Sequence, residues 1–159
     1  MAILKHISVK NRFYSSAVEY LTCQFDEYTN KPVLDEKGRI QERENYLIAG
    51  VNCDVDSFGA ECIEVNRLYG KNNSIKDVKA HHYIISFEPN DPITMEQALE
   101  FGKQWLSVFA PGHQAVVAVH PDGHNGSQNM HVHMVINSVR KYAGKQSRWH
   151  EKPCEFADV

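Results

Sequence analysis

Apolar and polar residues alternate in several short stretches of this chain, and that pattern predicts strands. Alternation places every second side chain on the same face of a sheet. The run 115–119 is wholly apolar, so we expect it to form a buried strand near the C-terminal end. The predicted strands are 2–9, 46–51, 81–87, 114–120 and 131–138.

Two helices are predicted in the N-terminal half. The first runs from about Ser15 to Phe25. Its buried side is expected to carry Ala17, Val18 and Leu21. Asp56 or Ser57 can cap a second helix, which continues to about Tyr69 and ends at Gly70.

A third helix follows a capping box, in which a Thr is followed three residues later by a Gln, here Thr94 and Gln97. Behind it, apolar residues recur at steps of three, four and three. This spacing predicts one core-facing stripe made of Ala98, Phe101, Trp105 and Val108.

The order of elements predicts the fold class. A polar hairpin is expected within residues 33–43, with its turn at Lys37 and Gly38. The order is therefore strand, helix, hairpin, strand, helix, strand, helix and two final strands. We expect an α+β domain with a central, mainly antiparallel sheet and helices packed largely on one face. Residues 1–159 are expected to form a single domain, the N-terminal part of a longer protein.

Composition and charge narrow the class of protein. The chain has 159 residues, of which 42% are apolar and 23% charged, which is ordinary for a soluble globular domain. No apolar stretch reaches transmembrane length and the start lacks a signal-peptide pattern, so we expect a cytoplasmic protein without membrane contact. The four cysteines show no CxxC pairing and are expected to be reduced.

The net charge of −3 argues against a generally basic nucleic-acid-binding surface. The charge is unevenly spread, however, because residues 35–64 are rich in acid and the C-terminal tail is basic. That tail is equally consistent with a solvated terminus and with a binding arm.

Three histidines are the most informative side chains for chemistry. His131 and His133 would point to the same face of one strand, and His120 follows the apolar run of the strand before it. A turn rich in Gly, Asn and Ser can bring the two strands side by side. Three imidazoles fill half of a metal shell and leave positions for water or a substrate oxygen, as a catalytic metal requires. The alternative is a pair of partly exposed polar residues on a strand.

A nucleophile is harder to find. The chain has no Gly-x-Ser-x-Gly motif, no P-loop and no Gly-rich dinucleotide motif. Tyr20 lies on the first predicted helix, where a tyrosine is more often a residue at the edge of the core. Its phenol could instead attack a phosphodiester. Phenol has a pKa of about 10, so it needs a base or a nearby cation to react at neutral pH.

Five segments together resemble the conjugative relaxases, mobilisation nucleases of the HUH endonuclease superfamily, and in particular the MobP-like branch. They are Ala17-Val18-Glu19-Tyr20-Leu21, His82-Tyr83-Ile84-Ile85-Ser86-Phe87, Glu96-Gln97-Ala98-Leu99-Glu100-Phe101-Gly102, and the pair His120-Pro121-Asp122 with His131-Val132-His133-Met134-Val135-Ile136-Asn137. The segments occur in the family's order, and the likeness runs from the first strand to about Trp149.

This resemblance implies an enzyme that cuts one strand at an origin of transfer of a mobile element and becomes linked to the 5′ phosphate. It implies Tyr20 as nucleophile, with His82 assisting proton removal. A divalent ion, Mg²⁺ or Mn²⁺, would be held by His120, His131 and His133, with Asp122 and Asn137 orienting the ligands. Accessory DNA-binding proteins and a coupling protein are the implied partners. Single-stranded DNA would contact Lys5, Lys10, Arg12, Arg140, Lys141, Lys145 and Arg148.

Several alternatives stay open at this point. The long segment 26–45 departs from the family pattern, so Tyr14 or Tyr28 could replace Tyr20 as the nucleophile. A replication initiator or transposase of the same superfamily would share the chemistry, although those groups tend to carry their tyrosine after the His-x-His pair. Two further alternatives remain. One is a metal-dependent phosphohydrolase that uses water, and the other is a non-catalytic metal-binding or DNA-binding module.

Overall fold

The structure is a computed structural model that describes residues 3–10, 14–23, 31–42, 45–121 and 129–142. Five strands form one sheet in the order β1-β3-β5-β4-β2, and every neighbouring pair is antiparallel. The strands are β1 (Ile3–Val9), β2 (Leu47–Val51), β3 (Ala80–Ser86), β4 (His113–His120) and β5 (His131–Arg140). Each predicted strand is found within two residues of its expected bounds, because the period-2 pattern is local.

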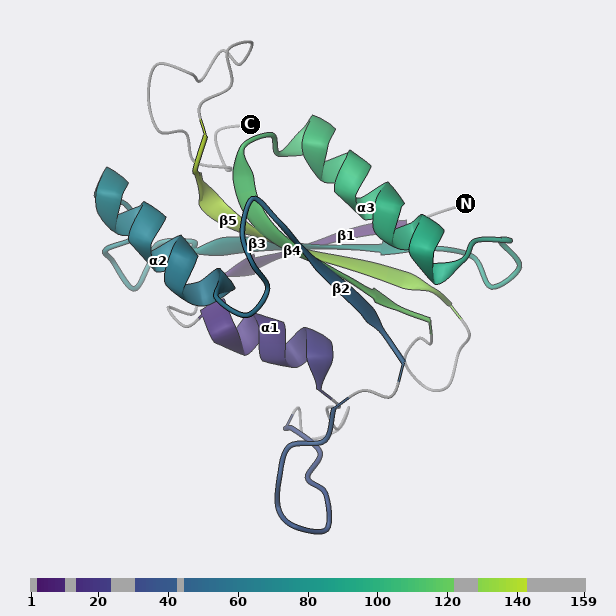
Figure 1. Ribbon diagram of the computed structural model, residues 1–159. Coiled ribbons are helices and arrows are strands. Elements are labelled where there is room, and N and C mark those ends of the chain that lie inside the picture. The colour runs from purple at the N-terminus through teal and green to yellow at the C-terminus, as the bar shows by residue number, and fades with distance from the viewer. Residues whose placement is uncertain (1–2, 11–13, 24–30, 43–44, 122–128, 143–159) are drawn as a thin grey trace.

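Helices cover both faces of this sheet (Figure 1). The helices α1 (Tyr14–Thr22) and α2 (Phe58–Tyr69) lie on one face, and α3 (Met95–Phe109) lies on the other. The predicted α+β class with an antiparallel sheet is confirmed. Two of the three helices in the described residues share a face, so the division is less one-sided than the order of elements suggested.

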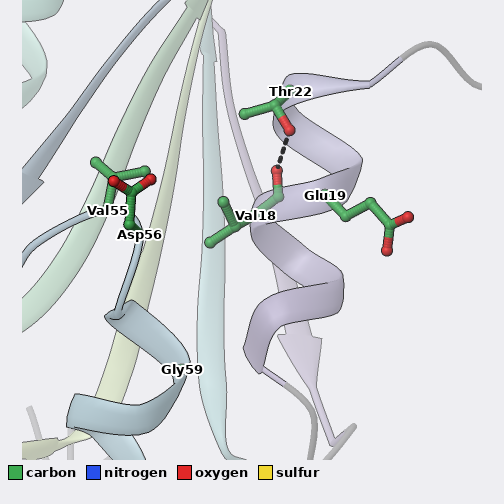
Figure 2. Close-up of a pocket in the computed structure, with 6 residues that line it drawn as sticks. All are labelled: Val18, Glu19, Thr22, Val55, Asp56 and Gly59. Carbon is green, nitrogen blue, oxygen red and sulfur yellow. Dashed lines mark hydrogen bonds between the residues drawn. The ribbon is translucent and has the colours of Figure 1, made fainter. Parts of the chain in front are cut away.

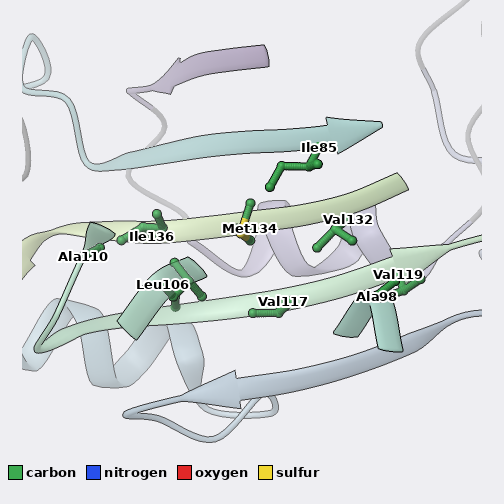
Figure 3. Packing of buried hydrophobic residues seen from close by; sticks show 10 residues of the cluster. Ile85, Ala98, Leu106, Ala110, Val117, Val119, Val132, Met134 and Ile136 are labelled. Atoms are coloured by element: carbon green, nitrogen blue, oxygen red, sulfur yellow. The ribbon is translucent and has the colours of Figure 1, made fainter. Parts of the chain in front are cut away.

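Alternation along β5 gives each face its own core. Val132, Met134 and Ile136 pack against α3, as Figure 3 shows for this cluster. Val135 points the other way and packs with Leu21 of α1 and Phe58 of α2. His131 and His133 share the face of Val135, because they lie four and two residues from it, respectively.

The stripe predicted on α3 is partly wrong. The capping box at Thr94 and Gln97 is present, but Phe101 is 41% exposed and Val108 is 84% exposed. The fully buried residues of α3 are Ala98, Gly102 and Leu106. A Cβ at position 102 would lie 2.8 Å from methyl groups of two buried valines. The helix therefore approaches the sheet through a glycine, which a search for large apolar residues does not find.

The remaining local predictions are confirmed in part. The polar hairpin is a turn with one isolated bridge between Leu34 and Ile40, and Gly38 adopts a positive φ of 77°. Gly70 ends α2 in the left-handed conformation. The first helix ends at Thr22, so its predicted end at Phe25 is wrong, and Cys23 already forms an isolated bridge with Glu42. None of the helices in the described part of the chain is long and apolar enough to cross a membrane.

Candidate functional site

The three histidines gather at one end of the sheet, on the face covered by α1 and α2. His120 and His131 are direct partners across β4 and β5, and His133 lies two residues further along β5. The ring of His133 is 4.5 Å from that of His120 and 6.1 Å from that of His131, measured between centroids. His120 and His133 are buried and His131 is half-buried. The predicted pairing of these strands therefore brings the three imidazoles together.

His82 joins this cluster from the neighbouring strand β3. Its Nε2 lies 3.0 Å from Nδ1 of His133. Burial, with a smaller contribution from the charges of Lys5 and His6, lowers the pKa of His82 to about 4. His82 is therefore neutral at pH 7, and one of the two rings must donate an N–H to a lone pair on the other. A distance between heavy atoms leaves two assignments of that proton.

His120 has a partner that sequence reasoning missed. Its Nε2 lies 2.7 Å from the carbonyl oxygen of Leu21 in α1. Because a carbonyl only accepts, Nε2 carries the hydrogen, and a neutral His120 keeps its lone pair on Nδ1. The Leu21 carbonyl belongs to the last turn of α1, where backbone acceptors have no partner within the helix. The contact therefore ties the end of α1 to β4.

Tyr20 lies beside the histidines at the margin of the buried side of α1. Tyr14 and Leu21 are buried and lie seven residues apart, which is about two helical turns. Tyr20 is half-buried and directly precedes Leu21. Its ring meets that of His82 edge-on, with 6.2 Å between centroids. The structure thus brings together the predicted tyrosine and the four predicted histidines.

Tyr14 does not fit the role of an alternative nucleophile. It is 3% exposed, and its hydroxyl lies 3.0 Å from both the Lys79 carbonyl and Oδ1 of Asn137. Burial raises the pKa of Tyr14 to about 12. A phenol that is buried, hydrogen-bonded and harder to ionise is a poor nucleophile. Tyr28, the other alternative, lies outside the described residues.

Asn137 does not lie with the histidines it was expected to support. It is four residues beyond His133, a distance of about 13 Å along a strand. Its amide contacts Tyr14, Asn66 and Gln114 instead. Asp122 lies outside the described residues.

The predicted DNA-contacting cations divide between the two ends of the sheet. Lys5 is exposed and shares a rung with Ile84 and His133. Lys10 is also exposed, but it follows the opposite end of β1. Arg140 was expected to contact DNA at the surface, and this expectation is wrong because the residue is only 5% exposed.

Lys141 lies near Arg140, where its Nζ is 3.3 Å from the carbonyl oxygen of Asn52. Both residues therefore lie at the end of β5 away from the histidines. Arg12, Lys145 and Arg148 lie outside the described residues.

The clustered histidines suit a divalent metal by the kind of atom they offer. Clustered imidazoles beside an edge-on phenol are groups that transition metals accept. Within the described ranges, however, no three His, Cys, Asp or Glu side chains are arranged to hold a metal ion as they stand. The ring nitrogens are directed in part to Leu21 and to His82. A bound ion therefore requires some histidine rings to turn.

A separate hollow of about 360 Å³ lies between α1 and the start of α2 (Figure 2). It is lined by Val18, Glu19, Thr22, Val55, Asp56 and Gly59. Its charged side chains, Glu19 and Asp56, are both acidic, which disfavours a phosphate. This hollow includes neither Tyr20 nor the histidines, so we do not assign the DNA to it.

Comparison with known families identifies the class of protein. Residues 28–155 match the family described as relaxase, MobA/VirD2-like, nuclease domain. The match covers most of the chain, and the chain belongs to this family. The matched region includes His82 and the three clustered histidines but begins after Tyr20.

Several curated proteins and solved structures are similar to this chain. Protein rlx of Staphylococcus aureus is 36% identical over 104 residues, which are 65% of this chain and 30% of that protein. The group II intron-interrupted relaxase LtrB of Lactococcus lactis subsp. cremoris is 40% identical over 99 residues, which are 62% of this chain and 15% of that protein. The chain therefore spans less than a third of either relative's length.

One solved structure is described as the molecular basis of vancomycin resistance transfer in Staphylococcus aureus. The likeness has a TM-score of 0.50 at 17% identity, and it covers 94% of this chain and 81% of that one. At this identity it supports the fold alone.

Proposed function

We propose that this chain is the nuclease domain of a longer relaxase that nicks one strand of DNA at an origin of transfer. One observation carries the proposal. Tyr20, His82 and the three clustered histidines meet at one end of one sheet face, in a chain that belongs to the relaxase nuclease family. A phenol beside a set of metal-binding imidazoles is suited to attack on a phosphodiester.

In the proposed reaction, Oη of Tyr20 forms a bond to the scissile phosphorus and the bond from phosphorus to the 3′ oxygen breaks. The phenol loses its proton and the released 3′ oxygen gains one, so no water is consumed. The product is a 5′-phosphotyrosine, which keeps the energy of the phosphodiester and allows later rejoining. We propose Tyr20 as the nucleophile because, unlike Tyr14 of the same helix, it is half-buried, and its ring lies against His82.

His120, His131 and His133 would hold the divalent ion, for which we propose Mg²⁺ or Mn²⁺. When bound, the ion neutralises charge on the phosphate oxygens and orients the phosphate for in-line attack. We assign the hydrogen between His82 and His133 to Nδ1 of His133. This assignment leaves Nε2 of His133 with its lone pair, and His82 then orients a ligand in the way that partners of metal-binding histidines do. The opposite assignment would leave His82 free to accept the proton of Tyr20.

The proposed substrate is single-stranded DNA in the cytoplasm. Lys5 is placed to contact a phosphate near the histidines, because its side chain is exposed and it lies level with His133 across strands β1, β3 and β5. A net charge of −3 provides little general attraction for DNA. We therefore propose that accessory DNA-binding proteins of the origin complex and a coupling protein act with the full-length chain.

Detection of a covalent adduct tests the proposal. Single-stranded DNA spanning the origin of the source element, labelled at its 3′ end, is incubated with the protein and Mn²⁺ and run on a denaturing gel. We expect a labelled band at protein mass for wild type and for Tyr69→Phe, a control at an exposed tyrosine of α2. Tyr20→Phe should form none.

Other results would change the assignment in defined ways. A band that survives in Tyr20→Phe would move the nucleophile to another tyrosine. Cleavage without an adduct would identify a phosphohydrolase that uses water. Binding of DNA without cleavage would identify a non-catalytic module.

A further inference from the structure

The hydroxyl of Tyr14 is the centre of a buried hydrogen-bond network. It accepts from Nδ2 of Asn66 in α2 at 2.7 Å. It donates toward the carbonyl of Lys79 and toward Oδ1 of Asn137, each at 3.0 Å. One hydroxyl hydrogen serves these two acceptors, so both are arranged around a single position of the oxygen.

Asn137 extends the network across the sheet. Its Nδ2 donates to Oδ1 of Asn66 and to Oε1 of Gln114, each at 3.2 Å. Asn66 is 6% exposed, and Gln114 and Asn137 are 0% exposed. The network therefore connects α1 to α2, to β4, to β5 and to the residue before β3. Buried polar groups of this kind hold a structure to one arrangement, because any shift leaves a polar atom without a partner.

The opposite end of α1 is held by the contact between Leu21 and His120 described above. The two attachment points, at Tyr14 and Leu21, are seven residues apart, or about 10 Å along the helix axis. Together they fix the rotation of α1 and its position along the sheet. A helix of nine residues is only marginally stable by itself, so it depends on tertiary contacts such as these two.

We propose that Tyr14 is a positioning residue for the nicking reaction, because its hydroxyl sets the placement of α1 and so of the Tyr20 hydroxyl relative to the histidines. This inference rests on the proposed function of Tyr20 as the nucleophile. Space filling alone does not require the Tyr14 hydroxyl. The Tyr14 ring meets Phe58 edge-on at 5.9 Å between centroids, and a phenylalanine would keep that contact.

The test compares Tyr14→Phe with Leu106→Val in the full chain. Leu106 is buried on the opposite face of the sheet, so its truncation lowers stability without touching α1. Both variants are assayed well below their melting temperatures, with saturating origin DNA and Mn²⁺. Two quantities are measured: the single-turnover rate of adduct formation and the Kd for DNA.

We expect Tyr14→Phe to slow adduct formation by roughly 10-fold or more, since a displacement of about 1 Å at a reacting group can cost about 100-fold. The Kd for DNA should stay within twofold of wild type. Leu106→Val should change neither quantity beyond twofold. Equal rates for the two variants would overturn the inference, as would a loss in Tyr14→Phe that appears only in Kd.

A second pair of variants tests the network itself. Asn137→Ala should slow adduct formation. The double variant that carries both Asn137→Ala and Tyr14→Phe should be slowed to a similar extent, so that the effects of the two substitutions are not additive. Additive effects would mean that Asn137 does not act through Tyr14, and would overturn the inference. If Tyr14→Phe does not fold, Asn66→Ala removes the shorter of the two hydrogen bonds that Tyr14 accepts, at 2.7 Å from Asn66 against 3.5 Å from Asn72, and is judged by the same rate and Kd.

Failure of the proposed function gives a different result. Wild type would then form no adduct, or Tyr20→Phe would still form one. If only the positioning role fails, wild type still forms the adduct and Tyr20→Phe forms none. Only the difference between Tyr14→Phe and Leu106→Val is then lost.

Discussion

His120 and His133 each use one ring nitrogen on a protein partner, which limits what the other nitrogen can do. His120 donates from Nε2 to the Leu21 carbonyl, and His133 shares a hydrogen with His82 through Nδ1. The assignment of these hydrogens decides which lone pairs are available to a metal. At the scale of single residues, the site therefore depends on partners that lie outside the His-x-His motif.

The role of His82 can be tested through metal affinity. We expect His82→Ala to weaken Mn²⁺ binding by about 10- to 100-fold, the usual effect of removing a group that orients a metal-binding histidine. Isothermal titration calorimetry of the DNA-free protein measures it. The matched control is His81→Ala, because His81 is buried next to His82 in β3 but on the opposite sheet face. Unchanged Mn²⁺ affinity with slower adduct formation would instead support His82 as the proton acceptor.

Among the elements, α3 shows most clearly where pattern and packing differ. Its capping box was predictable, because Thr94 and Gln97 contact each other and the local backbone alone. Its buried stripe was not, because burial depends on how closely the helix approaches the sheet. Gly102 permits that approach by leaving room for the methyl groups of Val117 and Val132. The large residues Phe101 and Val108 are exposed and do not fill the contact.

Gly102→Ala should lower the free energy of unfolding, although alanine favours helices over glycine by about 1 kcal/mol. The new Cβ would lie 2.8 Å from each of two stiff, buried valine side chains. Overpacking of this kind costs about 1 to 3 kcal/mol. Urea denaturation measures the change. Val108→Ala is the control and should shift the value by less than about 0.5 kcal/mol, because the side chain is exposed. A stabilised Gly102→Ala variant would contradict the close packing.

Over the whole molecule, the sheet buries polar groups as well as apolar ones. His113 is 3% exposed, and its Nδ1 lies 2.7 Å from the carbonyl oxygen of Asn137. Burial lowers the pKa of His113 to about 4, from an ordinary value of about 6.5 in the unfolded chain. Between these two values the unfolded state binds a proton that the folded state does not. Acid therefore favours unfolding.

The free energy of unfolding should fall as the pH drops from about 6.5 to about 4, and His113 alone should contribute about 3 kcal/mol of that loss. Above pH 7 the contribution is constant. Urea denaturation at a series of pH values measures it for wild type and His113→Gln. We expect the variant to be less stable at pH 7 but to lose less stability toward pH 4. Parallel curves for the two proteins would contradict the assignment.

The features that could be predicted are those decided within a few residues. The strand bounds, the end of α2 at Gly70, the capping box of α3 and the shared face of His131 and His133 all follow from local backbone geometry. The proximity of His120 to the other two histidines also followed, because a short connection between successive strands favours antiparallel pairing. Family resemblance then added the expected chemistry, which still awaits the adduct experiment.

The remaining features depend on contacts between distant parts of the chain. The strand order places β3 beside β5, and only this brings His82 to His133, 51 residues away. The burial of Tyr14 has the same origin, since its hydroxyl found its partners in elements that a linear pattern does not relate. Local geometry thus determined which side chains share a face. Long-range packing decided which of them meet, because burial and hydrogen bonding are properties of the assembled sheet and its helices.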